Sequence, residues 1–268
     1  MGLEPTSGTR VPTDESAGAV RWLRLEDSCP DDLANVRDRF PIAWIPLGTI
    51  EHHGWHLPVG FDGLKARALC ERVAARCGGV VWPTLFYGTG GGHLGFPWTV
   101  LVSPDEVAGL LDRTIDHLAE SGFRIVVLLT GHYPGEQVGM VADVARRAGE
   151  RHPGLQCLGI PEHRFMSPEP GDTLAGDHAA KYETSLALAL DPQWVDLPRL
   201  VPGRDPDQVR LPSTPHHGPI GVEFYEPGSP LFAVAGADPR EFASAALGQL
   251  LVDEFVERMA GWVRSRTD

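Results

Sequence analysis

The stretch RIVVLLTGH, residues 124–132, decides the fold. Six consecutive aliphatic or β-branched residues, 125–130, are typical of a parallel strand that is buried on both faces. A second apolar run, IAWIPLG at 42–48, is followed in the same way by the polar segment EHHGWHLP at 51–58. Both runs are therefore followed within a few residues by histidines. In open α/β sheets ligands bind at the carboxyl ends of the strands, so these two ends are the first places to look for chemistry.

Helical patterns alternate with these strands along the chain. The helix that begins after Ser103 has a capping box with Glu106, proline at its first position and a single apolar stripe. The alternation predicts an α/β fold with a mostly parallel central sheet and helices on both faces. We expect strands at 43–47, 80–82, 124–130 and 155–160, and helices at 64–76, 104–121, 137–151, 182–190 and 238–262.

The rest of the chain sets the domain organisation. Residues 1–18 are polar and rich in Gly, Pro, Ser and Thr, which predicts a flexible N-terminal tail. Residues 19–268 are expected to form a single domain, with long loops in the Pro-rich stretch from 191 to about 230.

Composition excludes several classes of function. The 268 residues carry a net charge of −13, which repels phosphate backbones and argues against nucleic-acid binding. No apolar run is long enough to span a bilayer, and the N-terminus lacks the apolar segment of a signal peptide. The four cysteines form no CxxC pair, so we expect reduced thiols and a cytoplasmic protein.

Three segments carry side chains of the kind that bind divalent metals. In the first, Glu51 and His53 point to the same side if the chain stays extended, and Asp62 follows nine residues after His53. In the second, His132 follows the strand 124–130. The third, GDHAAKYETS at 176–185, brings a histidine and two carboxylates to the start of a helix. Each has an ordinary alternative: histidines capping carbonyls in a polar loop, a structural His132, and Asp177 as a helix cap. Together they favour one shared site.

These segments resemble the creatininase family. The matching pieces are PLGTIEHHGWHLPVGFD at 46–62, PTLFYGTGGGHLGFPWT at 83–99, SGFRIVVLLTGHYPGEQ at 121–137 and GDHAAKYETSLALALDP at 176–192. The pattern E-x-H-G-x-H-L-P followed by Asp is the hallmark of the family. The resemblance covers a little over half of the chain and implies a creatininase-like α/β fold.

The resemblance also implies two divalent metal ions per chain, Zn or Mn and in some members Fe, bridged by a carboxylate. The matching positions are Glu51 and His132 for the first metal, His53 for the second metal, and Asp62 for the bridge.

One position departs from the family pattern. In creatininase a glutamate two residues after the histidine binds the second metal, and Pro134 stands at that place here. Glu183, which matches the glutamate of the family's ETS string, is the expected replacement. Glu136 is a weaker candidate.

Other residues match positions near the substrate. His178 matches a histidine assigned to substrate contact and proton transfer, and we expect it to be catalytic. The Trp-Asp pair that contacts creatinine would fall at Leu174 and Ala175, which counts against creatinine as the substrate. Four further residues are expected in substrate binding: Tyr133, His93, Trp55 and Asp177.

The expected function is a metal-dependent amidohydrolase. It would cleave a C–N amide bond of a small cyclic or linear amide, of the lactam or cyclic-urea type, with a metal-activated water. The alternative is a non-catalytic member of the fold that binds a metal or a metabolite, which Pro134 keeps open. By family analogy the chain forms a homo-oligomer, a hexamer.

Two other patterns are interpreted as loop features without a catalytic role. The string GGGHLG at 90–95 matches the glycine spacing of dinucleotide-binding loops. FPWTV at 96–100 reads as extended chain where that motif requires a helix, so we expect a flexible loop beside the pocket. The pair His216-His217 is interpreted as a loop feature, because adjacent side chains in extended chain point apart.

Overall fold

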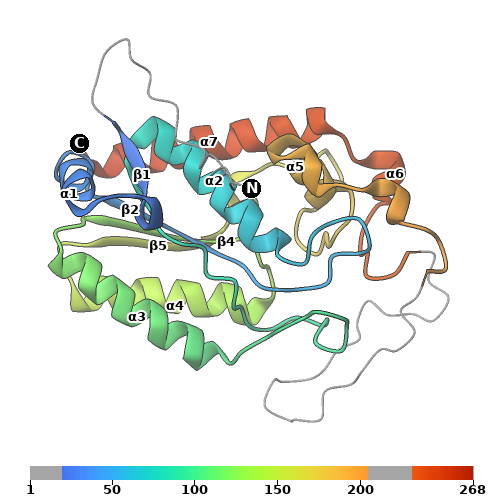
Figure 1. Ribbon diagram of the computed structural model, residues 1–268, viewed down its shortest axis with the longest axis horizontal. Coiled ribbons are helices and arrows are strands. Elements are labelled where there is room, and N and C mark those ends of the chain that lie inside the picture. The colour runs from blue at the N-terminus through green and yellow to red at the C-terminus, as the bar shows by residue number, and fades with distance from the viewer. Residues whose placement is uncertain (1–19, 205–230, 268) are drawn as a thin grey trace, which may run out of the picture.

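The computed structural model describes residues 20–204 and 231–267. They form a five-stranded, all-parallel sheet between two layers of helices, which confirms the predicted fold class (Figure 1). The strands are β1 (Trp22–Arg24), β2 (Ile42–Leu47), β3 (Gly79–Val81), β4 (Ile125–Thr130) and β5 (Gln156–Pro161). The helices are α1 (Pro30–Arg39), α2 (Phe61–Cys77), α3 (Pro104–Glu120), α4 (Gly135–Arg151), α5 (Lys181–Leu190), α6 (Pro239–Phe242) and α7 (Ala245–Thr267).

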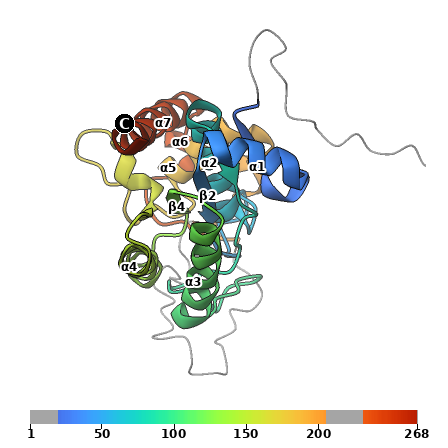
Figure 2. The same cartoon turned by 90° about the vertical axis from the view of Figure 1, so that its left-hand side faces the viewer.

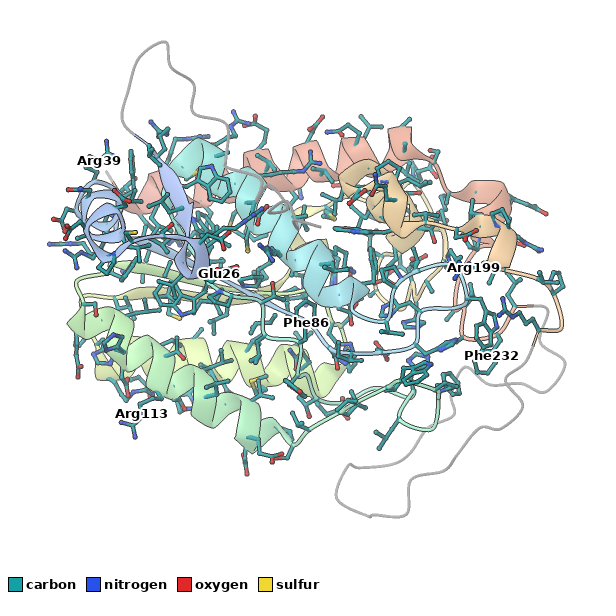
Figure 3. The ribbon with its side chains drawn as sticks, in the orientation of Figure 1. Glu26, Arg39, Phe86, Arg113, Arg199 and Phe232 are labelled. Carbon is teal, nitrogen blue, oxygen red and sulfur yellow. The ribbon has the colours of Figure 1, made fainter. Side chains whose placement is uncertain are left out.

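Two hydrophobic cores lie on the two faces of the sheet. Successive strand residues point to opposite faces, so Trp44 and Val127 pack toward α2, α5 and α7, whereas Ala43 and Val126 pack toward α1, α3 and α4. Every residue of β2 and β4 is buried, as their continuous apolar runs predict. Figure 2 shows the two helical layers on either side of the strands, and Arg113 on the outer face of α3 points away from them (Figure 3).

The strand order β1-β3-β2-β4-β5 makes the neighbours β2 and β4 the point at which the chain connections run in opposite directions. The chain leaves β2 through α2 toward β3 on one side, and leaves β4 through α4 toward β5 on the other. Leu47 pairs with Thr130, so the two strands end side by side. Loops that diverge from neighbouring strand ends leave room for a ligand between them. The fold therefore brings residues 51–62 and 131–134 to one edge of the sheet.

The sequence-based prediction missed two elements and misjudged two others. Strand β1 is only three residues long, and α1 buries a single side chain, Val36, so neither gives a strong pattern. The helix expected at 238–262 is broken between α6 and α7, because Ser244 donates its N–H to Ser185 Oγ and caps Leu247 N with its own hydroxyl. Residues 93–99 form turns rather than extended chain, since Phe96 N donates to His93 O and Thr99 N to Phe96 O.

Some predictions lie outside the described residues, namely the tail at 1–18 and the pair His216-His217. Where the structure does describe the Pro-rich stretch, residues 191–204 form two short 3-10 turns, Pro192–Trp194 and Leu197–Arg199. Over residues 20–204 and 231–267, no helix has both the length and the apolar character needed to cross a membrane.

Candidate metal centre

The five predicted metal ligands converge at the carboxyl ends of β2 and β4. They come from the loop after β2, the loop after β4, and the first turns of α2 and α5. A cavity of about 350 Å³ lies against them. Its lining includes Glu51, Asp62, His132 and Glu183, together with Gly91, His93, Tyr133, Pro134, Glu136, Asp177 and His178.

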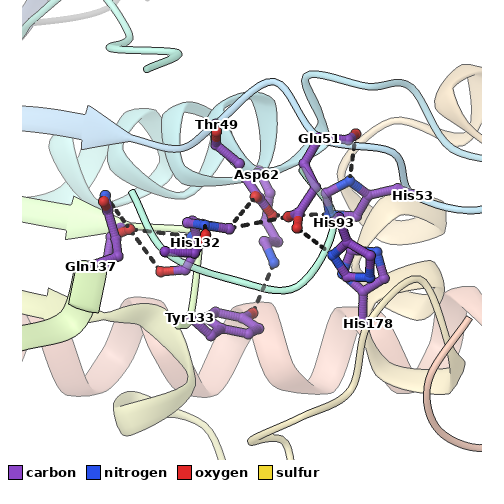
Figure 4. A network of polar contacts seen from close by, with 12 residues as sticks. Thr49, Glu51, His53, Asp62, His93, His132, Tyr133, Gln137 and His178 are labelled. Carbon is purple, nitrogen blue, oxygen red and sulfur yellow. Dashed lines mark hydrogen bonds and ion pairs between the residues drawn. The ribbon is translucent and has the colours of Figure 1, made fainter. Parts of the chain in front are cut away.

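Among the described residues, ligand-type side chains form three close sets: two share Asp62, and the third joins Glu51, His53 and His178. In the first set with Asp62, which we name the first site, His132 Nδ1 lies 3.2 Å from Glu51 Oε2 and 3.1 Å from Asp62 Oδ2. In the second site, His53 Nε2 lies 3.1 Å from Asp62 Oδ1 and 3.7 Å from Glu183 Oε2. Within each set the three ligand-type atoms lie within 4.8 Å of one another. Asp62 thus turns one oxygen toward each of the two sets that share it, which is the arrangement of a bridging carboxylate (Figure 4).

Both histidines are oriented by backbone carbonyls. His53 Nδ1 lies 3.0 Å from Glu51 O, and His132 Nε2 lies 3.2 Å from Gly90 O. When those nitrogens donate, the opposite nitrogens keep their lone pairs and face the carboxylates. Metal-binding histidines show this second contact, which fixes their tautomer and ring orientation. The donor set of imidazole nitrogens and carboxylate oxygens suits Zn²⁺ or Mn²⁺, so the residues present fit the metals that the sequence implies.

The electrostatics of the cluster favour added cations. Glu51, Asp62 and Glu183 are all at most 2% exposed, and buried carboxylates require compensation by positive charge. Burial opposes the charged form of each histidine, yet the surrounding carboxylates raise the pKa of His53 to about 9 and that of His132 to about 10. The field that holds a proton on an imidazole also attracts a divalent ion to the same position.

Particular residues at the end of β4 and at the starts of α2 and α5 allow these elements to come close together. A Cβ atom at Gly131 would lie 2.2 Å from the carbonyl oxygen of Asp62, so only glycine lets the end of β4 meet the start of α2. Thr130 Oγ1 accepts from His132 N at 3.2 Å and holds the turn after β4. Asp62 and Glu183 occupy the first turns of α2 and α5, where the helix dipole stabilises negative charge.

Comparison with known proteins shows the family of this chain. The protein-family model Creatininase, described as creatinine amidohydrolase, matches residues 27–263. The chain belongs to the creatininase family. It is 30% identical to the creatinine amidohydrolase of Pseudomonas putida, over 92% of this chain and 95% of that one.

Two further relatives of this creatininase-family chain are informative. It is 31% identical to the mycofactocin precursor peptide peptidase of Mycobacterium tuberculosis, over 95% of this chain and 94% of that one. A solved mutant creatininase of "Zn-Zn type" superposes with a TM-score of 0.69 at 27% identity, covering 91% of this chain and 97% of that one.

The two candidate replacements for the ligand missing at Pro134 lie in different surroundings. Pro134 lines the cavity and offers no ligand atom. Glu183 lies in the second site with His53 and Asp62. Glu136 is exposed at the cavity and belongs to none of the ligand sets among the described residues. The geometry therefore favours Glu183 over Glu136.

The predicted catalytic histidine lies against the second site. The ring of His178 stacks on that of His93 at a centroid distance of 4.1 Å and faces that of His53 at 4.4 Å (Figure 4). His178 Nε2 lies 2.9 Å from the carbonyl oxygen of His52, and burial holds the pKa of His178 well below its ordinary value. His93, predicted near the substrate, contacts Glu51 through Nδ1.

The other predicted substrate-binding residues have different surroundings. Asp177 lines the cavity, and its two oxygens accept N–H groups in the first turn of α5, from Tyr182 at 3.3 Å and Glu183 at 2.9 Å. The N-cap residue of α5 is Ala180, so the alternative interpretation of Asp177 as the N-cap is wrong in position. Trp55 is not among the residues that line the cavity. Its indole N–H donates to Arg204 O at 2.7 Å, and its ring packs 6.1 Å from that of Phe232.

Sequence reasoning missed two charged residues beneath the site, Lys65 and Glu162, both fully buried. Lys65 Nζ donates to Tyr133 OH at 2.8 Å, so the hydroxyl of Tyr133, a residue that lines the cavity, has a protein partner. Glu162 follows β5 directly, and the rule that directs attention to strand ends applies to it as well. Lys65 gives no such signal, because a lysine on a helix is almost always exposed.

Proposed function

We propose that this member of the creatininase family is a dinuclear metal-dependent amidohydrolase. The observation that carries the proposal is Asp62, whose two oxygens face two separate ligand sets. The first site would be formed by Glu51, Asp62 and His132, and the second by His53, Asp62 and Glu183. Zn²⁺ or Mn²⁺ suits both sets of donors.

The residues of the site have separate roles in the proposed reaction. Divalent ions bound in such sites supply an acidified water and polarise a carbonyl group of the substrate. Glu51, Asp62 and Glu183 would provide the negative charge that retains the ions, and an amide that entered the cavity would lie beside them. His178 lines the same cavity, and an imidazole there can pass a proton to the leaving nitrogen as the C–N bond breaks.

The substrate we propose is a small cyclic or linear amide of the lactam or cyclic-urea type. Leu174 and Ala175 stand where the family's creatinine-contacting Trp-Asp pair would fall. Leu174 is buried in the hydrophobic core and Ala175 is exposed, and neither lines the cavity. This supports an amide other than creatinine. Relatives named creatinine amidohydrolase and mycofactocin precursor peptide peptidase support the inclusion of both cyclic and linear amides in this proposal.

A non-catalytic metal-binding role is the alternative, because Pro134 removes one family ligand. Two further parts of the proposal rest on cysteine usage and family likeness alone: a cytoplasmic location and a homo-oligomeric state, a hexamer by analogy.

Metal analysis followed by a substrate screen tests the proposal. The purified chain should carry about two Zn or Mn ions, and the metal-loaded protein should hydrolyse at least one compound from a panel of lactams, cyclic ureas and short peptide amides. Removal of metal by a chelator should abolish turnover, and re-addition should restore it. A folded chain with no affinity for Zn²⁺ or Mn²⁺ would contradict the metal centre. Two bound ions with no turnover across the panel would support the non-catalytic role.

A further inference from the structure

A buried ion-pair network lies directly beneath the second site. Lys65, on α2 one turn after Asp62, is fully buried, and its Nζ lies 2.6 Å from Glu183 Oε1 and 2.9 Å from Glu162 Oε1. Glu162, at the end of β5, is fully buried too. One positive charge therefore lies between two carboxylates in the protein interior, where a lysine is retained only if its ammonium group is paired.

The network fixes which oxygen of Glu183 is available. Lys65 holds Oε1, and Ala179 N donates to Oε2 at 2.8 Å. Oε2 lies 3.7 Å from His53 Nε2. The carboxylate is thus held at both ends, with one oxygen turned toward the second site and the other turned away from it.

Lys65 also contacts Tyr133 and Phe61. Tyr133 OH accepts from Lys65 Nζ and donates to Glu162 Oε1, so the three groups form a closed triangle. The faces of two aromatic rings, those of Phe61 and Tyr133, lie 5.0 Å and 4.4 Å from Nζ. Removing any one charge from this triangle would leave a buried partner unpaired.

The first site has no lysine in this role. Its carboxylate Glu51, which is also grouped with His53 and His178, contacts His93 and His132, and among residues 20–204 and 231–267 no lysine forms an ion pair with it. Because Pro134 offers no ligand atom, Glu183 is the single carboxylate that belongs to the second site alone. Its placement therefore decides how well that site binds a metal.

We propose that Lys65 and Glu162 are positioning residues that present Glu183 Oε2 to the metal of the second site, and so set the affinity of that site separately from the first. The inference rests on the proposed function, since it requires that metals bind. Neither residue lines the cavity, so both act through Glu183 rather than on the substrate.

The double variant Lys65→Met with Glu162→Gln tests this. It removes one positive and one negative charge together, so the summed charge of the network is unchanged while Glu183 loses its contact with Lys65. Metal-free protein is titrated with Mn²⁺ by calorimetry, and anomalous diffraction from crystals at limiting Mn²⁺ shows which site fills. We expect the second site to bind about 10- to 100-fold more weakly and the first site to be unchanged.

Lys181→Met is the matched control. Lys181 begins the same helix as Glu183 but pairs with Glu169 and Asp172 at the surface, so both affinities should equal those of the wild type. If the double variant does not fold, Glu162→Gln alone replaces it, with an expected weakening of about tenfold at the second site only.

Three results would overturn the inference: wild-type affinities in the folded double variant or in Glu162→Gln, equal weakening of both sites, or the same effect in Lys181→Met. Failure of the wild-type chain to bind any Mn²⁺ or Zn²⁺ would instead contradict the proposed function, so the two failures are distinguishable.

Discussion

Replacing Asp62 by alanine should remove the stabilisation that metals give this protein, because Asp62 belongs to both sites. A bound ligand stabilises the folded state by about 2.7 kcal/mol when its free concentration is 100 times its Kd. Two sites would together contribute about 5 kcal/mol under that condition. In a chain of this size 1 kcal/mol shifts Tm by about 2–4 °C, so the wild-type protein should gain about 10–20 °C on metal addition.

The assay is thermal unfolding of metal-free protein with and without Zn²⁺ or Mn²⁺. Each variant is compared with itself, so any direct effect of the substitution on the metal-free fold cancels. Asp62→Ala should show almost no gain. Glu183→Gln, which affects the second site alone, should keep about half of the wild-type gain.

Asp116→Ala is the control, because Asp116 also pairs with a histidine, His152, at 2.7 Å, but on the outer surface of α3 and α4. It should keep the full gain. The bridging role would be refuted by a full metal-dependent gain in Asp62→Ala, or by an equal loss in Asp116→Ala.

Two more substitutions test the site. His178→Asn should lower turnover by about 100-fold or more while both metals remain bound, because the variant lacks the proton-transfer group. Steady-state kinetics and metal analysis of the same sample measure this. Unchanged turnover would show that His178 has no part in the mechanism. Gly131→Ala should destabilise the protein by at least about 1–3 kcal/mol, because its Cβ would overlap the Asp62 carbonyl oxygen at 2.2 Å. Denaturant unfolding measures this, and wild-type stability would show that β4 and α2 approach each other less closely.

The hydrophobic pattern was sufficient to predict most of the fold. The apolar runs of β2 and β4 are buried at every residue, and the capping box of Ser103 and Glu106 begins α3 as expected. These signals are local, because a strand buried on both faces and a capped helix start each give a recognisable pattern within a few residues of sequence. Elements with a weak hydrophobic pattern were not predicted: α1 buries one side chain, and β1 spans three residues.

The break between α6 and α7 shows why pattern alone was insufficient. The capped start at Asp238 and the apolar stripe from Leu247 to Trp262 together predict one helix, and nothing between them in the sequence marks the break. The break depends on Ser185 of α5, whose hydroxyl accepts the N–H of Ser244, a contact between residues 59 positions apart. Trp55 was likewise assigned to the substrate from its place in the hallmark loop, and the fold turns it toward Arg204.

The sequence by itself determined the α/β class, the family and the residues able to hold divalent metals, because residue type and local spacing encode these properties. Only the tertiary structure decided which of those residues share a metal site and what supports them. The strand order brought the ends of β2 and β4 together, and it buried Lys65 between Glu183 and Glu162. A charge in the interior is stable only beside partners that arrive from distant parts of the chain, and no local pattern records where they will come from.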